Sequence, residues 1–377
     1  MTERVRQLDL QLVISLLAPV LAAALALLVG AVMLLLLGTN PLEAYAAMVA
    51  GAFGSANAVA DTLVKATPLL FVGLGICIAF RGGVLNIGGE GQLVAGALAA
   101  TIVALYVPTL PSWAMIPTCL MAGLLSGAVW GGIPGVLKAY LNVNEILSTI
   151  MMNMIAVQGM NFLLRGPLMD PVQVEVGSFI PQTARLSRAA DLPRWVPTRL
   201  HMGTGLAVVL AVLVYAFLWR TIIGYRIRAA GLNPYASRVA GIPVKRYMVL
   251  SLLLAGALAG LGGAVQVLGL HHRMFTDGSA TGFTGSAGFN GIVAALFGQL
   301  HPLATVPASI LFGALLVGAN QMQRVMQVPS AFVTALNGFV VMFVVGSEIL
   351  RRRRVQRVDL GEPSDVDARE PKTGVAP

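Results

Sequence analysis

A chain of 377 residues with 57% hydrophobic and only 11% charged residues cannot be an ordinary soluble protein, in which about 25% of residues are charged. The composition instead predicts an all-α membrane protein that crosses the bilayer many times. The net charge of +9 does not indicate a nucleic-acid partner, because the charges are sparse. In a membrane protein, an excess of Lys and Arg reports orientation.

A membrane-spanning helix needs about 20 mostly apolar residues. Stretches without Asp, Glu, Lys or Arg, divided where 108–112 and His301-Pro302 interrupt them, predict ten spans. In chain order these are 12–37, 63–80, 91–107, 113–137, 146–164, 203–219, 248–270, 284–300, 303–322 and 331–347. We interpret the first as an uncleaved helix, because its apolar run is longer than that of a signal peptide. Glycine-rich stretches beside 63–80 and 284–300 leave the bounds of these two spans open.

Ten spans place both termini on one side of the membrane. If that side is the cytoplasm, the inside segments hold 17 of the 25 Lys and Arg residues, as the positive-inside rule requires. Six of them lie in the loop 220–247, which contains no acid, whereas the long loop 165–201 lies outside. The tail 355–377 is polar and contains several prolines, so we expect it to be disordered and cytoplasmic.

The two halves of the chain share weak similarity that predicts an inverted repeat. In every match, the two members are separated by nearly the same number of residues along the chain. The matches are Gly38-Thr39-Asn40-Pro41 with Gly231-Leu232-Asn233-Pro234, Gly127-Ala128 with Gly313-Ala314, and Val143 and Thr149 with Val328 and Thr334. The matches pair the first five predicted spans with the last five. Because five is odd, repeat two (about 200–350) would be inverted relative to repeat one (about 10–165). Chance similarity in so biased a composition is the alternative.

The sequence shows no arrangement typical of an enzyme. It contains neither a phosphate-binding G-x(4)-G-K-[ST] loop nor a metal-binding H-E-x-x-H motif. Cys77 and Cys119 fall within spans and are interpreted as core residues. We therefore expect a transport protein with no catalytic residue, no metal site and no cofactor.

Two glycine-rich stretches carry polar residues into apolar surroundings. The first, 81–92, contains Asn86, Glu90 and Gln92, and the second, 281–291, contains Asn290. Irregular backbone at membrane depth is tolerated only where it is buried in protein or lines a cavity. The first stretch is therefore either a re-entrant element or an ordinary cytoplasmic turn before a helix that starts at Glu90.

Candidate residues for a translocation path are Asn86, Glu90, Gln92, Asn290 and Asn337. The alternative for each amide is a simple hydrogen bond across helices, worth about 0.6 kcal/mol. The acids that we expect nearest to a span, Glu145 and Glu348, both lie at helix ends. A proton-coupled transporter normally buries an acid deeper, which counts against that class.

The basic loop 220–247 predicts a short capped helix. Asn233 suits the N-cap, Pro234 suits the first helical position, and Gly241 followed by Pro243 would end the helix. A short helix on a basic surface suits the docking of a partner, and a plain positive-inside loop is the alternative.

Three motifs resemble the permease subunits of bacterial ABC importers. They are G-G-V-L-N-I-G-G-E-G-Q at 82–92, R-A-A-G-L-N-P-Y-A-S-R-V-A-G-I at 228–242 and G-F-N-G-I-V-A-A-L-F-G at 288–298. The family serves branched-chain amino acids, ribose-type sugars and nucleosides. The resemblance is closest to the nucleoside and simple-sugar branch, in which the N-I-G-x-E-G-Q wording found here at 86–92 is typical, and N-P-L-E-A-Y at 40–45 also fits. The resemblance covers about residues 10–350.

This resemblance implies a permease domain over 1–354 in a bacterial inner membrane, importing a nucleoside or simple sugar by alternating access. It implies that a separate ATPase docks on a coupling helix, and the matching positions are Gly231, Asn233, Pro234, Ala236, Arg238 and Gly241. An extracytoplasmic solute-binding protein would dock on 38–62 and 165–201, where Asn40, Pro41, Glu43 and Tyr45 are the candidates. A second permease, often a different chain in this branch, would complete the pathway.

Three alternatives remain open on the sequence. An ion-coupled secondary transporter with an inverted repeat would work without an ATPase. An ABC permease for branched-chain amino acids would share the machinery and differ in solute. An intramembrane enzyme would need a catalytic pair within the spans, and the sequence offers none.

Overall fold

The computed structural model describes residue 21 and residues 24–178, 180–195 and 197–329, together with 331–332, 335–336, 338–339, 342–343 and 346. The regular structure of this part of the chain is helical, apart from two isolated β-bridges. The predicted tail 355–377 and the path candidate Asn337 lie outside the described residues, as do parts of the predicted spans 12–37 and 331–347.

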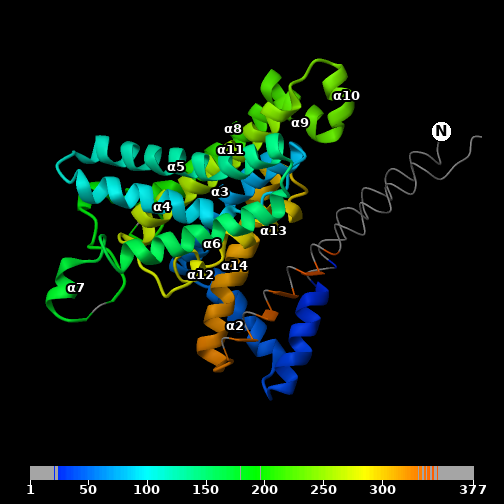
Figure 1. Ribbon diagram of the computed structural model, residues 1–377. Coiled ribbons are helices and arrows are strands. Elements are labelled where there is room, and N and C mark those ends of the chain that lie inside the picture. Colours follow the sequence, from blue (N-terminus) through cyan, green and yellow to red (C-terminus); the bar gives the residue numbers. More distant parts are fainter. Residues whose placement is uncertain are drawn as a thin grey trace, which may run out of the picture.

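Seven described helices are long and apolar enough to cross a membrane (Figure 1). They are α3 (Ala56–Arg81), α4 (Gly89–Tyr106), α5 (Ser112–Leu141), α6 (Glu145–Leu164), α8 (Met202–Arg220), α11 (Val244–Gln266) with its π-helical extension η2 (Val267–His271), and α14 (Pro302–Met326). The shorter elements are α2 (Pro41–Phe53), α7 (Pro171–Glu175), η1 (Arg188–Ala190), α9 (Ile222–Leu232), α10 (Pro234–Val239), α12 (Ala280–Thr284) and α13 (Ala287–Phe297). A further apolar helix, Ala24–Leu36, precedes α2.

These seven helices coincide with seven of the predicted spans, but the predicted span 284–300 is different. The structure has the 11-residue helix α13 there. At 1.5 Å per residue, α13 covers roughly half of a hydrocarbon core about 30 Å thick. The physical reason lies just before it, where Gly285 and Ser286 adopt left-handed backbone angles that interrupt the helix.

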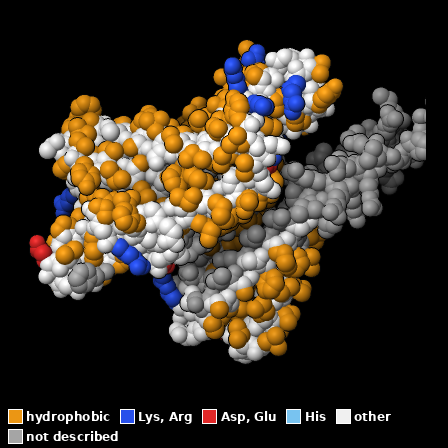
Figure 2. All heavy atoms as spheres, viewed as in Figure 1, with side chains coloured by type: hydrophobic (Ala, Val, Ile, Leu, Met, Phe, Trp, Pro, Cys, Tyr) orange, Lys and Arg blue, Asp and Glu red, His pale blue; other side chains and the backbone are white. Residues whose placement is uncertain are grey.

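The centre of the molecule is formed by α3 and α11, whose most apolar windows are 83% and 72% buried. The corresponding values for α6 and α8 are only 22% and 28%, so these helices lie at the periphery. Figure 2 shows hydrophobic side chains spread over the face that α4, α5 and α6 occupy in Figure 1. Such a surface suits contact with lipid or with another membrane protein.

Glycines bring α4, α5 and α11 into backbone contact. A Cβ atom at Gly127 of α5 would overlap the carbonyl oxygen of Gly256 and lie 2.6 Å from the Cα of Gly260, both on α11. A Cβ at Gly96 of α4 would overlap the carbonyl of the same Gly260. Small residues at four-residue spacing allow this close approach, which is a common way for membrane helices to associate.

Positions that match between the two halves of the sequence also have similar local structure. Asn40 and Asn233 both cap a helix with their side chains, and proline occupies the first position of each helix. Asn142 ends α5 and Gln327 ends α14 with nearly identical left-handed angles, φ 54° in both. Gly313 of α14 approaches the backbone of α3, as Gly127 of α5 approaches that of α11.

The loop 165–201 packs onto the segment that follows α11. Backbone amides of Thr183, Leu186 and Leu192 donate to the carbonyls of Met274, His272 and Leu268 at 2.8, 2.9 and 3.1 Å. Figure 1 shows α7 of this loop at one end of the bundle and α9–α10 at the other. Figure 2 shows Lys and Arg side chains gathered over the α9–α10 end.

Candidate functional site

The segment 82–88 runs back along α3 after α3 has ended. Gly83 lies beside Gly231, because a Cβ at Gly83 would be 2.9 Å from the Cα of Gly231. Six residues later, a Cβ at Gly89 would lie 3.0 Å from Cγ1 of Val72. Val72 is nine residues before Arg81, the last residue of α3, so α4 begins about 13 Å back from that end. The segment therefore folds back along α3, as a re-entrant element would, and α4 begins one residue before Glu90, as the alternative of a turn before a helix expects.

Glu90 joins the start of α4 to the start of α13. Its side chain is only 1% exposed. Its Oε1 accepts hydrogen bonds from the backbone amides of Gly288 and Phe289 at 3.1 and 3.4 Å, and the hydroxyl of Thr284 adds a side-chain hydrogen bond. The N-cap residue of α13 makes no side-chain cap, so Glu90 satisfies first-turn amides that would otherwise lack partners.

A set of amide side chains fixes the re-entrant segment. Asn86 and Gln92 bond each other twice, at 3.0 and 3.1 Å. Asn153 of α6 donates to the carbonyl of Ile87 at 2.9 Å and accepts from the amide of Gly91 at 2.7 Å. The backbone of the segment is therefore held by α6 as well as by its own side chains.

The structure thus brings four of the five path candidates to one place. Asn86, Glu90 and Gln92 surround the start of α4, and Asn290 follows the two α13 residues whose amides bond Glu90. The fifth, Asn337, lies outside the described residues. Asn153 is the contributor that the sequence did not single out; its position within an apolar span was the available signal.

The position of Glu90 changes one inference drawn from the sequence. We named Glu145 and Glu348 as the acids nearest to a span, and left open whether Glu90 lies in a re-entrant element or in a cytoplasmic turn. Because the re-entrant segment carries it back beside α3, Glu90 is a buried acid within the bundle. The argument against an ion-coupled transporter was that it normally buries an acid more deeply than a helix end. Because Glu90 is buried, that argument no longer applies.

The short helix predicted in the basic loop is confirmed as α10. The side chain of Asn233 accepts from the amide of Ala236 at 2.9 Å, Pro234 is the first helical residue, and Gly241 has a φ of 77°. Ser237 faces inward, while Tyr235, Arg238 and Val239 are exposed. An exposed aromatic and apolar surface on a projecting helix is available to a protein partner.

Gly231, at the end of α9, connects α10 with the bundle. A Cβ there would overlap the carbonyl oxygen of Arg81 and lie 2.6 Å from the amide nitrogen of Gly83. The α9–α10 unit therefore rests directly on the start of the re-entrant segment. Nearby, Arg81 stacks 4.6 Å from the centre of the Trp219 ring and donates to the carbonyl of Leu300 at 2.9 Å, which ties α3 to α8 and to the turn before α14.

The candidates for binding-protein docking lie at the start of α2. Asn40 accepts from the amide of Leu42 at 3.0 Å and donates to Glu43 at 2.9 Å, so these side chains form the cap of the helix. Tyr45 points inward instead, and its hydroxyl donates to the carbonyl of Leu27. Asn40 and Glu43 are exposed, and Pro41 and Tyr45 are partly buried.

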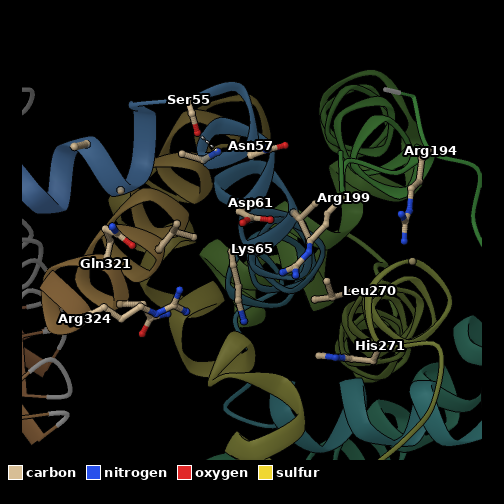
Figure 3. A pocket seen from close by; sticks show the side chains of 17 residues that line it. Ser55, Asn57, Asp61, Lys65, Arg194, Arg199, Leu270, His271, Gln321 and Arg324 are labelled. Atoms are coloured by element: carbon tan, nitrogen blue, oxygen red, sulfur yellow. Dashed lines mark hydrogen bonds between the residues drawn. The ribbon is translucent and has the colours of Figure 1, made fainter. Parts of the chain in front are cut away.

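A cavity of about 650 Å³ opens at the end of the bundle that carries loop 165–201 (Figure 3). It lies between α2, α3, the loop, η2 and α14, and the charged residues that line it are Asp61, Lys65, Arg194, Arg199 and Arg324. A second and much smaller pocket, here called the narrow extension, shares Lys65 and Leu270 with the cavity and is also lined by Gln266 and Thr284. His201 borders this extension; burial, together with the charges of His272 and Arg194, lowers its pKa to about 4, so it is neutral at pH 7.

Comparison with known proteins gives a consistent result. A family described as the branched-chain amino acid transport system permease component matches residues 58–345. The guanosine ABC transporter permease protein NupP of Bacillus subtilis is 36% identical, covering 89% of this chain and 94% of its own. The glucose ABC transporter permease protein TsgB13 of Haloferax volcanii is 35% identical, covering 89% of each chain. The nucleoside ABC transporter permease protein NupB of Lactococcus lactis is 32% identical, covering 87% and 90%.

Proposed function

The chain belongs to the family of branched-chain amino acid transport system permease components, and from this membership we propose its solute, its partners and its mechanism. It is a multi-pass membrane protein and the permease subunit of an ABC importer. We propose that its solute is a nucleoside or a simple sugar, because relatives with about a third of their residues identical are named for guanosine, nucleosides and glucose. A branched-chain amino acid is the alternative solute.

The membrane topology that we propose has ten membrane elements, of which α13 is too short to cross the bilayer alone, with both termini in the cytoplasm of a bacterial inner membrane. The distribution of Lys and Arg supports this orientation. The paired caps, Asn40 with Asn233 and Asn142 with Gln327, support an inverted repeat of five elements each. In this arrangement, α13 is the counterpart of α4 and lies with its N-terminus against it.

ATP hydrolysis takes place on a separate subunit that docks on α10. The observation that carries this proposal is the projecting helix with its exposed Tyr235, set on a basic loop at one end of the bundle. A solute-binding protein docks at the opposite end, on loop 165–201 and the start of α2. A second permease subunit, different from this chain, packs against it in the membrane.

Movement of α10 passes to the solute path through the contact of Gly231 with Arg81 and Gly83. From there the re-entrant segment leads within a few residues to Glu90 and to the start of α13. We expect α13 to shift relative to α4 as the importer alternates between its two open states. Asn86, Glu90, Gln92 and Asn290 then border the path, together with Asn337.

Substituting Tyr235→Ala tests the docking proposal. Exposed aromatic residues often dominate an interface, and losing such an anchor costs about 2 kcal/mol or more, roughly a thirtyfold loss of affinity. We expect the ATPase to co-purify poorly with the variant, and solute-stimulated ATP hydrolysis to fall with it.

Tyr106→Ala is the matched control, since Tyr106 is similarly exposed, 69% against 77%, at the end of α4. It should leave both measurements unchanged. Full co-purification and full hydrolysis in the Tyr235 variant would rule out α10 as the docking element, and uptake that continues without any ATPase would favour an ion-coupled transporter.

A further inference from the structure

The cavity of about 650 Å³ has an unusual charge. Among the described residues that line it, four cations, Lys65, Arg194, Arg199 and Arg324, face one carboxylate, that of Asp61. In Figure 3 the side chains of Lys65, Arg199 and Arg324 reach toward one another from α3, the loop and α14. Like charges gathered in one concave space repel each other and attract counter-ions.

The described part of the chain does not neutralise these cations by ion pairing. Its two ion pairs, Lys138 with Glu145 and His272 with Asp191, involve none of the four. Asp61 precedes Lys65 by one helical turn, but the two do not form an ion pair. Counted over the described residues, the cavity therefore has an excess of positive charge that an incoming anion would neutralise.

Lys65 lies at the inner end of the cavity. It borders both the cavity and its narrow extension, and its Nζ is 3.5 Å from the position that a Cβ on Gly285 would occupy. Gly285 follows Thr284, which bonds Glu90. A ligand held by Lys65 would therefore lie next to the segment that leads to α13.

The remaining polar residues of the cavity suit a hydroxylated molecule. Asn57, Asn320 and Gln321 provide amide donors and acceptors from α3 and α14. The volume is within the range of about 300–1,000 Å³ that small-molecule sites occupy. We propose that this cavity receives the transported solute and that the solute carries an anionic group, a phosphate or a carboxylate, on a nucleoside or sugar.

This inference rests on the proposed function and deepens it by naming the charge of the solute. An acidic side chain of a docked protein could reach Arg194 or Arg199 at the exposed rim, but Lys65 lies at the inner end and is partly buried. Lys65, Arg199 and Arg324 all line the cavity, so a small anion inside it is attracted by all three. The arrangement therefore favours a small solute over a protein side chain.

Binding to the purified full-length chain tests the proposal directly. Cys77 and Cys119 are free and buried, so a thiol-reactive fluorogenic dye reports unfolding. Guanosine 5′-monophosphate, glucose 6-phosphate and gluconate are compared with guanosine and glucose at constant ionic strength. We expect the best anionic solute to raise the Tm with an apparent Kd at least about tenfold below that of its neutral counterpart. The ranking of phosphates against gluconate identifies the anionic group.

Variants of the cavity separate charge from structure. Lys65→Gln combined with Arg199→Gln should remove the preference for the anion, whereas Lys65→Arg should retain it. Arg185→Gln combined with Arg188→Gln, an equal loss of charge at exposed positions of the same loop but outside the cavity, should leave the Tm shift unchanged. Equal shifts with neutral and anionic solutes, or an anion preference that survives in the double variant, would overturn the proposal.

Uptake by the complete importer distinguishes this inference from the function on which it rests. If neutral nucleosides or sugars enter the cell in an ATPase-dependent manner and their phosphates do not, the inference fails and the proposed function stands. If neither the neutral nucleosides and sugars nor their anionic derivatives are taken up, the proposed solute class is wrong, even if the purified chain binds one of them.

Discussion

Replacing Gly127 with alanine is expected to lower the Tm of the purified chain markedly, and replacing it with leucine is expected to prevent the protein from accumulating in the membrane. The added Cβ would overlap the carbonyl of Gly256 and lie 2.6 Å from the Cα of Gly260. These contacts are backbone atoms in the middle of α11, so no side chain can rotate away and the helices must separate. Overpacking of this kind costs about 1–3 kcal/mol, and leucine would cost more.

Gly132 offers a control on the same helix. A Cβ at Gly132 would meet only a side-chain atom of Leu253, at 4.0 Å, which is ordinary contact. Alanine is also a better helix former than glycine by about 1 kcal/mol. Gly132→Ala should therefore leave the Tm unchanged or raise it, and similar losses of Tm in the two alanine variants would show that the contact between α5 and α11 is not the cause.

Substituting Glu90 with leucine is expected to abolish uptake by the complete importer. Leucine removes the oxygen that accepts from Gly288 and Phe289, and a buried amide left without a partner costs about 1–3 kcal/mol. The start of α13 would then lose its hydrogen bonds to α4. Glutamine keeps one acceptor oxygen, so Glu90→Gln should retain a part of the uptake.

Hydrogen–deuterium exchange separates this local effect from general damage. In Glu90→Leu the amides at the start of α13 should exchange faster, while those of α11 stay protected. Glu175→Leu, which removes an exposed acid in loop 165–201, should leave the exchange of both helices unchanged. If these amides are as protected from exchange in Glu90→Leu as in the wild type, the hydrogen bonds from Glu90 do not hold the start of α13 in place.

Sequence patterns predicted those elements whose causes are local. Long uncharged runs predicted seven helices, and the Asn-Pro pair at 233–234 predicted α10 together with its cap. The predicted span 284–300 was wrong because its residues are as apolar as those of a spanning helix. Hydropathy does not register that Gly285 and Ser286 turn the backbone into left-handed conformations.

The candidate site was predictable in its residues but not in its geometry. Glycines beside Asn86 and Glu90 marked an irregular segment, yet nothing local shows that the segment folds back along α3. Glu90 and its partner Gly288 are separated by 198 positions in the chain, and such a pairing follows only from the packing of α4 against α13. The cavity cations come from α3, a loop and α14, so no single stretch of sequence carries their pattern.

The glycine contacts among α4, α5 and α11 also limit how this importer can change shape. Helices that touch through their backbones have no layer of side chains that could slide or repack, so we expect these three to move as one rigid body. We expect the bending to take place outside these contacts, at the left-handed turn of Gly285 and Ser286 before α13. The contact between Gly96 and Gly260 therefore belongs to the part of the importer that we expect to stay fixed while other parts move.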